Sequence, residues 1–220
     1  MSALYNLFKG RALSSIRIII TLLILVPLSS ITHSETTERF TKLDDAGEAL
    51  PLDAKKWACV ADNRTGLIWE KRDPSSALHD HDTYIWYQPE AEVTGSERAY
   101  ESEDWADNTC FGFDANDPAN YCNTKAYADR VNQSRYCGFD DWRLPSVTEL
   151  LSLRDRAIKS HPDSSGLNVE MFPFHKPFVF WTSSTNDSGT VLTVFGDDRV
   201  LENSERSDSI SLRLVRERQD

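Results

Sequence analysis

The stretch that decides the fold, CGFDDWRLPSVTELLSL, runs from Cys137 to Leu153 and sets a Trp, an Arg and a Pro directly before a helix. Ser146 and Glu149 match the S-x-x-E capping box, and Pro145 ends the extended segment that precedes it. Apolar residues then recur at helical spacing at Val147, Leu150, Leu151 and Ile158. The stretch therefore predicts a helix that starts just after Ser146.

The charged residues of this stretch have two interpretations. In one, Asp140 or Asp141 is a general base and Arg143 an anion clamp, but the sequence places no nucleophile or metal beside them. In the other, which we favour, Trp142 fills the junction between helices and sheet, and Arg143 satisfies carbonyls or a carboxylate with its planar fork of donors. We assign structural roles to Trp69, Trp142, Arg143, Pro145, Ser146, Glu149 and Trp181 and a catalytic role to no residue.

The first 34 residues have the layout of a secretory signal peptide. They carry three basic residues and no acidic one before Ile18–Leu28, a run of 11 residues that is apolar except for Thr21. A membrane-spanning helix needs about 20 such residues. We expect cleavage after Ser34, with an uncleaved N-terminal anchor as the alternative. Either way, the body is predicted to be exported, to the periplasm or the cell surface, with a linker over 35–56 and one domain over 57–218.

The charge of the exported part limits its partners. Removal of the three basic residues with the leader would change the net charge from −11 to −14. Such acidity disfavours nucleic acid and anionic membranes as partners. We therefore expect no nucleic-acid binding and no membrane span beyond the N-terminal signal or anchor.

Four cysteines in an exported chain indicate two disulfides, for which three pairings exist. The chain has no C-x-x-C, which argues against a zinc ribbon or a thioredoxin-like site. We favour Cys110–Cys122, because it closes a loop rich in Asp, Asn and Gly with little apolar surface of its own, and a bridge of that length contributes about 3 kcal/mol. Cys59–Cys137 is the pair that remains.

The rest of the pattern predicts an α+β fold. A hairpin is expected over Trp57–Glu70, long loops over 71–121 and a helix over Asn123–Gln133 capped by Asn123. Strand-forming runs follow at Phe178–Ser184, Val191–Phe195, Arg199–Glu202 and Ile210–Arg216. In the last run, Ile210, Leu212 and Leu214 alternate, so one face should be buried.

Several segments, DNRTGLIWE, YADRVNQ, CGFDDWRLPSVTELLSL, FWTSS and LRLVR, resemble the bacterial Lcl C-terminal-like domain in the same order, over Trp57–Arg216. The resemblance implies an exported domain related to the C-type-lectin-like fold, in which the terminal strands pair and two helices flank a mainly antiparallel sheet with long stapled loops. The family's named member is a bacterial surface adhesin that binds host glycans. That adhesin carries a collagen-like stalk. This chain has no Gly-X-Y repeat, and the family supplies no catalytic residues to carry over.

Aromatic residues in the long loops are candidates for ligand binding. Exposed rings at Tyr84, Trp86, Tyr87 and Trp105 would stack on sugars, although we expect at least half of these rings to lie in the core.

Two segments carry side chains that could bind a metal ion, and for both the alternative is a solvated loop. His79 and His81 offer two zinc ligands without a third. Asp114, Asn116 and Asp117 form an oxygen-rich loop that would suit calcium but does not match an EF-hand. The sequence signatures with which C-type lectins bind sugar through calcium are misplaced or incomplete in this chain. We therefore expect no cofactor and keep calcium as a low-ranked hypothesis.

Taken as a sequence, the chain is predicted to be an exported binding module that recognises a glycan or a protein and is not an enzyme. The alternative is an envelope scaffold or accessory subunit that docks a protein partner. A hydrolase is a weaker alternative, because Ser183 and Ser184 lie in no G-x-S-x-G elbow.

Overall fold

The structure is a computed structural model that describes residues 38–72, 82–87, 109–154, 167–168, 170–173, 179–187, 191–195, 200–201 and 204–219. The chain divides into two compact units, Met1–Glu35 and Thr36–Asp220. The predicted signal peptide lies outside the described residues. Among the residues that are described, no helix is long and apolar enough to cross a membrane.

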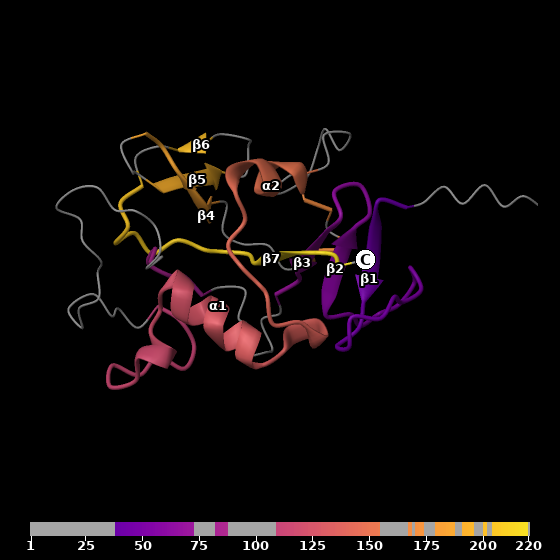
Figure 1. The fold of residues 1–220 in the computed structure, drawn as a ribbon, viewed down its shortest axis with the longest axis horizontal. Coiled ribbons are helices and arrows are strands. Elements are labelled where there is room, and N and C mark those ends of the chain that lie inside the picture. Colours follow the sequence, from indigo (N-terminus) through magenta and orange to yellow (C-terminus); the bar gives the residue numbers. More distant parts are fainter. Residues whose placement is uncertain are drawn as a thin grey trace, which may run out of the picture. The chain divides into compact units, whose positions relative to one another are not determined.

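The first sheet holds four antiparallel strands in the order β1-β2-β3-β7 (Figure 1). The strands are β1 (Phe40–Leu43), β2 (Cys59–Asp62), β3 (Leu67–Glu70) and β7 (Val215–Glu217). The predicted hairpin is confirmed as β2 and β3, which turn at Gly66 with φ +72°. Strand β1 lies within residues 35–56, the range predicted as a linker, and pairs along its whole length with β2. The terminal strands β1 and β7 occupy opposite edges and do not pair.

A second sheet of three antiparallel strands has the order β4-β5-β6. Its strands are β4 (Val179–Thr185), β5 (Val191–Phe195) and β6 (Val200–Leu201). The expectation of one mainly antiparallel sheet is therefore wrong: the described strands form two sheets.

The C-terminal segment connects the two sheets. The amide of Trp181 in β4 donates to the Ser211 carbonyl at 2.9 Å, and the amide of Glu70 in β3 donates to the Leu214 carbonyl at 3.0 Å. Figure 1 shows this segment, in yellow, running from the β4 side toward β3. Because it passes between packed layers, Ser211 to Arg216 are all buried. Leu212 and Leu214, expected on one face, are buried as the alternation predicted, and the residues of the opposite face, Ser211 and Arg213, are buried as well.

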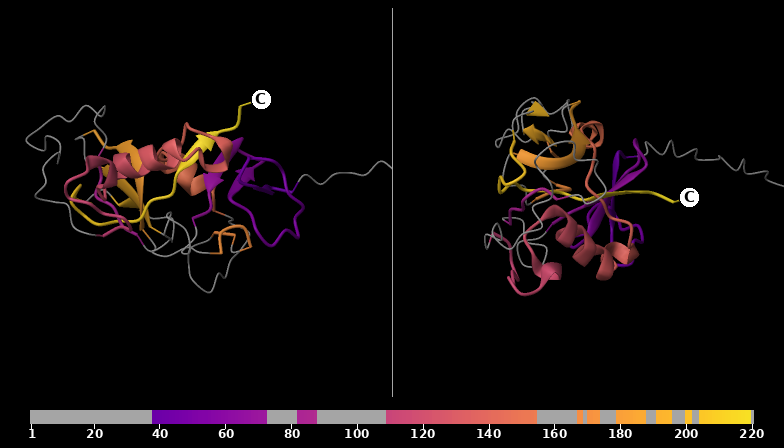
Figure 2. Two further views of the ribbon diagram at one scale, coloured as in Figure 1. Left: turned by 90° about the horizontal axis from the view of Figure 1, so that it is seen from below. Right: turned by 60° about the vertical axis from the view of Figure 1, so that its left-hand side comes forward.

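Both predicted helices are present (Figure 2). Helix α1 (Thr124–Gln133) begins with the Asn123 side chain accepting from the Ala126 amide, and α2 (Val147–Ser152) has the predicted capping box. Two short 3-10 helices accompany them: η2 (Pro118–Asn120) and η3 (Tyr136–Gly138). Ile158, expected to continue α2, lies outside the described residues.

Both predicted disulfides are present, Cys59–Cys137 and Cys110–Cys122. The first joins β2 to η3, and the second closes the loop before α1. All four sulfurs belong to the core cluster that also contains Trp86, Trp142 and Trp181. A second cluster contains Trp69, Phe172, Leu150 of α2 and Leu153, the C-cap residue of α2. The two bridges thus fix η3 and the loop before α1 covalently within the core.

Candidate functional site

Arg143 lies beside α2 and binds a carboxylate on it. Its two terminal nitrogens donate to the two oxygens of Glu149 at 2.9 and 2.7 Å, and one of them reaches Glu217 at 3.3 Å. Hydrogen bonding by Arg143 lowers the pKa of Glu149, and the same bond raises the pKa of Arg143. Its backbone bridges β7 at Val215. Arg143 therefore links the cap of α2 to the edge of the first sheet.

The two acidic neighbours of Trp142 do not face Arg143. Asp141 accepts from Arg216 at 2.5 and 3.1 Å, and the Arg216 guanidinium also lies 3.8 Å from the centroid of the Phe139 ring. Asp140 pairs with Arg135 at 3.1 Å, where both side chains are exposed. Both carboxylates are therefore engaged by guanidiniums other than that of Arg143.

The three tryptophans assigned structural roles are buried. Trp69 and Trp181 are 0% exposed and Trp142 is 2% exposed. The Trp142 indole donates to the Tyr136 carbonyl at 3.0 Å and the Trp181 indole to the Tyr84 carbonyl at 2.6 Å. These two indoles hold loops against the core through their N–H groups. The Trp69 indole N–H is buried and has no hydrogen-bond partner among the described residues.

A polar cluster that the sequence analysis missed lies inside the domain. The Glu70 carboxylate, fully buried, accepts from the Tyr127 hydroxyl and from the Leu214 amide at 2.9 Å. Burial raises the pKa of Glu70, while the guanidiniums of Arg72 and Arg213 oppose that rise. Arg213 donates to the Glu70 and Lys71 carbonyls at 2.5 and 3.0 Å. In the sequence, the only signal for this cluster was the spacing of two between Glu70, at the end of β3, and Arg72.

This cluster is closed to solvent. Glu70, Arg72, Tyr127 and Arg213 are each at most 1% exposed, so a substrate has no access to them. Buried charges are tolerated when they are paired and hydrogen-bonded, and here they bind the C-terminal segment to β3. The arrangement fixes the C-terminal segment against the first sheet.

The candidate ligand-binding aromatics do not form one surface. Tyr84 and Trp86 are each 1% exposed, so their assignment as stacking platforms is wrong. The Trp86 indole donates to the Thr182 carbonyl at 2.9 Å, and the Arg206 guanidinium lies 4.5 Å from its ring centroid. Tyr87 is half-buried, and its backbone exchanges two hydrogen bonds with the Thr124 hydroxyl. Trp105 lies outside the described residues.

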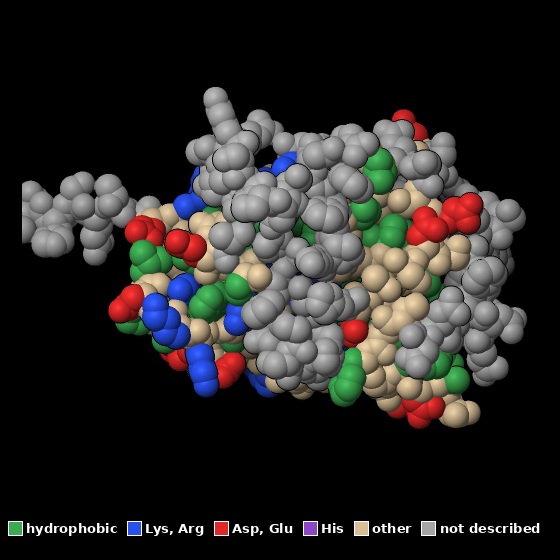
Figure 3. All heavy atoms as spheres, turned by 180° about the vertical axis from the view of Figure 1, so that it is seen from behind, with side chains coloured by type: hydrophobic (Ala, Val, Ile, Leu, Met, Phe, Trp, Pro, Cys, Tyr) green, Lys and Arg blue, Asp and Glu red, His purple; other side chains and the backbone are tan. Residues whose placement is uncertain are grey.

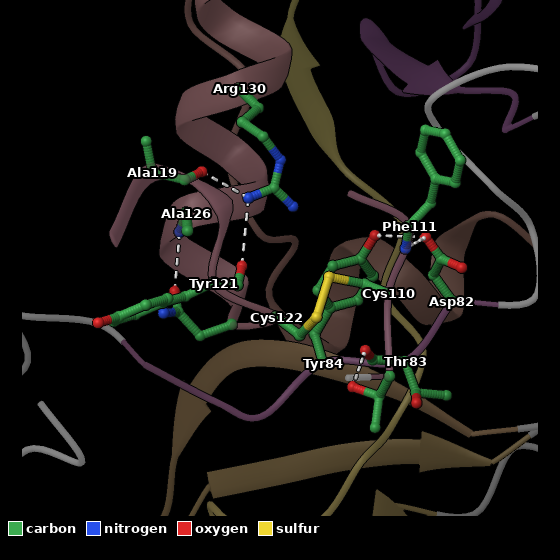
Figure 4. Close-up of a disulfide and its surroundings, with 12 residues drawn as sticks. Asp82, Thr83, Tyr84, Cys110, Phe111, Ala119, Tyr121, Cys122, Ala126 and Arg130 are labelled. Carbon is green, nitrogen blue, oxygen red and sulfur yellow. Dashed lines mark hydrogen bonds between the residues drawn. A yellow bond between two sulfur atoms is a disulfide. The ribbon is translucent and has the colours of Figure 1, made fainter. Parts of the chain in front are cut away.

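The most exposed large apolar side chain in the described part of the chain is instead Phe111, at 62%. It follows Cys110 in the segment that the Cys110–Cys122 bridge closes, which we call the stapled loop (residues 110–122). Figure 4 shows its ring directed away from the disulfide and its amide bound to Asp82, at 2.8 Å from Oδ2. Gly112, with φ +79°, turns the chain directly after it. An aromatic between a bridged Cys and a Gly was a signal that sequence reasoning passed over.

Several bonds hold the stapled loop in shape. Asp114 accepts from the Asn116 amide at 2.9 Å and Asp117 from the Ala119 amide at 3.0 Å. From α1, Arg130 donates to the carbonyls of Ala119 at 2.7 Å and Tyr121 at 3.2 Å (Figure 4). The loop is therefore ordered by its own turns, by the disulfide and by one arginine.

The metal candidates do not converge. Asp114, Asn116 and Asp117 use their side chains in the turns of the stapled loop, and Asn116 Nδ2 also donates to Asp114 at 3.2 Å. Among the described residues, no group of three His, Cys, Asp or Glu side chains is placed to hold a metal ion. His79 and His81 lie outside them.

These features define an α+β domain with two disulfides, a buried polar cluster closed to solvent and a stapled loop that displays one exposed aromatic ring. A comparison with protein families identifies the domain: the model of the Lcl C-terminal domain matches residues 58–216, more than half of the 220-residue chain. The chain therefore belongs to the Lcl C-terminal domain family, as the resemblance of its segments predicted. Comparisons with curated proteins and with solved structures found no match.

Proposed function

We propose that this chain is an exported binding module of the cell envelope, which recognises a glycan or protein ligand through its loops and performs no catalysis. The observation that carries the proposal is the stapled loop, which presents Phe111 at 62% exposure on a backbone fixed by a disulfide. Pre-ordering a loop removes much of the entropic cost of binding, and a rigid exposed aromatic supplies contact area. Membership of the Lcl C-terminal domain family suggests an extracellular type of module.

Two finer features belong to this proposal. Export, to the periplasm or the surface, is supported by two disulfides in a chain whose cysteines are all paired. A relation to the C-type-lectin-like fold is supported by the family match and by two helices beside antiparallel sheets. A cofactor is not part of the proposed function.

The absence of catalysis is proposed on the state of the candidate residues. Ser184 uses its hydroxyl to accept from the Val147 amide at 3.1 Å, and Asp141 is held by Arg216. A panel of phosphatase, protease and glycosidase substrates tests this point. Turnover that survives purification and is lost in Ser183→Ala or Asp141→Asn would establish the hydrolase instead.

A glycan array with the exported protein tests the binding function, using Phe111→Ala against Leu52→Ala as a matched control. Leu52 is an exposed apolar side chain, at 48%, outside the stapled loop. We expect Phe111→Ala to abolish ligand binding and Leu52→Ala to preserve it. Co-purification of a stoichiometric protein that neither substitution affects would favour the scaffold or accessory subunit.

A further inference from the structure

The Asp82 carboxylate and the Phe111 ring form a corner whose chemistry points to a class of ligand. The Phe111 amide donates to Asp82 Oδ2 at 2.8 Å, and the Tyr84 hydroxyl reaches the same oxygen at 3.5 Å. The described residues give the other oxygen, Oδ1, no hydrogen bond. Asp82 as a whole is only partly buried.

The ring and the carboxylate are held together by covalent and hydrogen-bonded constraints (Figure 4). Thr83 donates its amide to the Thr109 carbonyl at 3.1 Å and accepts from the Thr109 hydroxyl at 2.8 Å, which joins the two segments next to the corner. Cys110, bonded to Cys122, fixes the backbone on the other side of Phe111. The corner is therefore pre-formed before any ligand arrives.

The nearby charge is negative. The stapled loop contains Asp114 and Asp117 and no Lys or Arg. Arg72 donates to the Asp82 backbone carbonyl at 3.4 Å. Its guanidinium also donates to the Ser211 hydroxyl and the Leu212 carbonyl, and it interacts electrostatically with the Glu70 carboxylate. Arg130 is likewise engaged with loop carbonyls.

The basic side chain of Lys125, in the first turn of α1, is paired with Asp129 at 2.5 Å. On the face in Figure 3, the described Lys and Arg side chains gather over the end that carries β1, β2 and β3. The stapled loop lies at the other end, beside the start of α1 (Figures 1 and 2). A cationic ligand that approaches this end meets a negative local field.

We propose that the Asp82–Phe111 corner binds a Lys or Arg side chain of a basic peptide segment. This rests on the proposed binding function and names its ligand. The cation lies over the face of the Phe111 ring and donates to Asp82 Oδ1, so one group satisfies both the ring quadrupole and the carboxylate. A neutral sugar would use the ring but would draw no benefit from the charge of Asp82.

The test measures binding of the full exported protein to a fluorescent peptide in which Lys and Arg alternate with Gly and Ser. A second peptide has acetyl-lysine and citrulline in place of the basic residues. We expect only the basic peptide to bind, and more weakly at 500 mM than at 50 mM salt. The reason is that the distance over which exposed charges interact shortens from about 10 Å at moderate salt to about 3 Å at high salt. Equal binding of the two peptides overturns the inference.

Two substitutions and one control locate the site. Asp82→Asn removes the charge while its amide oxygen still accepts from the Phe111 amide, and Phe111→Leu removes the ring while keeping an apolar side chain. Each is expected to weaken peptide binding about fivefold, equivalent to about 1 kcal/mol. Asp140→Asn changes net charge equally, at an acid already paired with Arg135, and should bind as the parent does. Equal effects of Asp82→Asn and Asp140→Asn overturn the inference.

The glycan array separates this inference from the function beneath it. Glycan binding that Phe111→Leu abolishes and Asp82→Asn preserves would uphold the binding module and reject the cationic ligand. If Phe111→Ala leaves peptide, glycan and protein binding unchanged, both the cationic ligand and the proposed binding function are rejected.

Discussion

The two disulfides are expected to differ in their contribution to stability, because they close loops of different length. Cys59 and Cys137 are 78 positions apart, whereas Cys110 and Cys122 are 12 apart. The entropy of closing loops of these sizes in the unfolded chain gives about 4.5 kcal/mol for the first bridge and about 2.8 kcal/mol for the second. Replacing both cysteines of a pair by alanine should therefore cost about 1.7 kcal/mol more at Cys59–Cys137.

The two pairs are well matched for this comparison. Cys59 and Cys137 are 0% and 2% exposed, and Cys110 and Cys122 are 5% and 4% exposed. All four pack in the same core cluster, so the loss of sulfur packing largely cancels between the two double variants. What remains is the difference in loop closure.

Guanidinium denaturation of the exported protein under non-reducing conditions measures the difference directly. Thermal melting gives a second reading, with the Cys59→Ala/Cys137→Ala variant expected to melt about 3–7 °C below Cys110→Ala/Cys122→Ala. Equal losses, or a larger loss at Cys110–Cys122, would refute the loop-entropy reasoning and indicate structure that persists in the unfolded chain. Limited proteolysis distinguishes the variants further, because only the second should be cut faster within residues 111–121.

Three other predictions follow from contacts in the fold. Arg143→Ala should lower stability by about 1 kcal/mol at neutral pH, a value reduced by solvent screening because the Arg143 side chain is 42% exposed. Since the pKa of Glu149 is lowered in the folded state, this stabilisation is present above the ordinary carboxyl pKa of about 4.3 and is lost as pH falls through the folded value, so denaturation at pH 7 and pH 3 should show the difference between parent and variant shrink in acid. Gly138→Ala should cost about 2 kcal/mol or more in chemical denaturation, because the residue has φ +77° and a Cβ would stand 2.9 Å from the Ala46 carbonyl oxygen; Gly112→Ala, with φ +79° and no atom within 4 Å, isolates the backbone cost of about 1 kcal/mol, and similar losses at the two sites would contradict the role of the contact. Tyr127→Phe should cost about 1–3 kcal/mol by removing a hydrogen bond to the buried Glu70 carboxylate, whereas Tyr121→Phe, which loses an exposed bond of 3.4 Å, should melt as the parent does.

Local patterns in the sequence predicted what depends on near neighbours. The S-x-x-E pattern at Ser146 gave the start of α2, and Asn123 gave the start of α1, because a cap acts within one helical turn. The hairpin over β2 and β3 follows from turn residues between two short strand-forming runs. The Cys110–Cys122 pairing could also be favoured, since a short polar loop needs such a bridge.

Other features depended on contacts between residues far apart in the chain. Ile210–Arg216 alternates as a half-buried strand would, yet both of its faces are covered, because it runs between two sheets that the pattern did not separate. The same placement buries Arg213 beside Glu70, a pairing across 143 positions that no local period encodes.

The sequence by itself determined the α+β class, the helix starts, the hairpin and the family, because caps, turns and ordered motifs act over a few residues. Only the tertiary structure decided which aromatics are exposed. Tyr84 and Trp86 pack inward against α1 and β4, whereas Phe111 projects from the stapled loop. Solvent exposure of a side chain is set by what the rest of the chain packs against it, and that is a property of the folded whole.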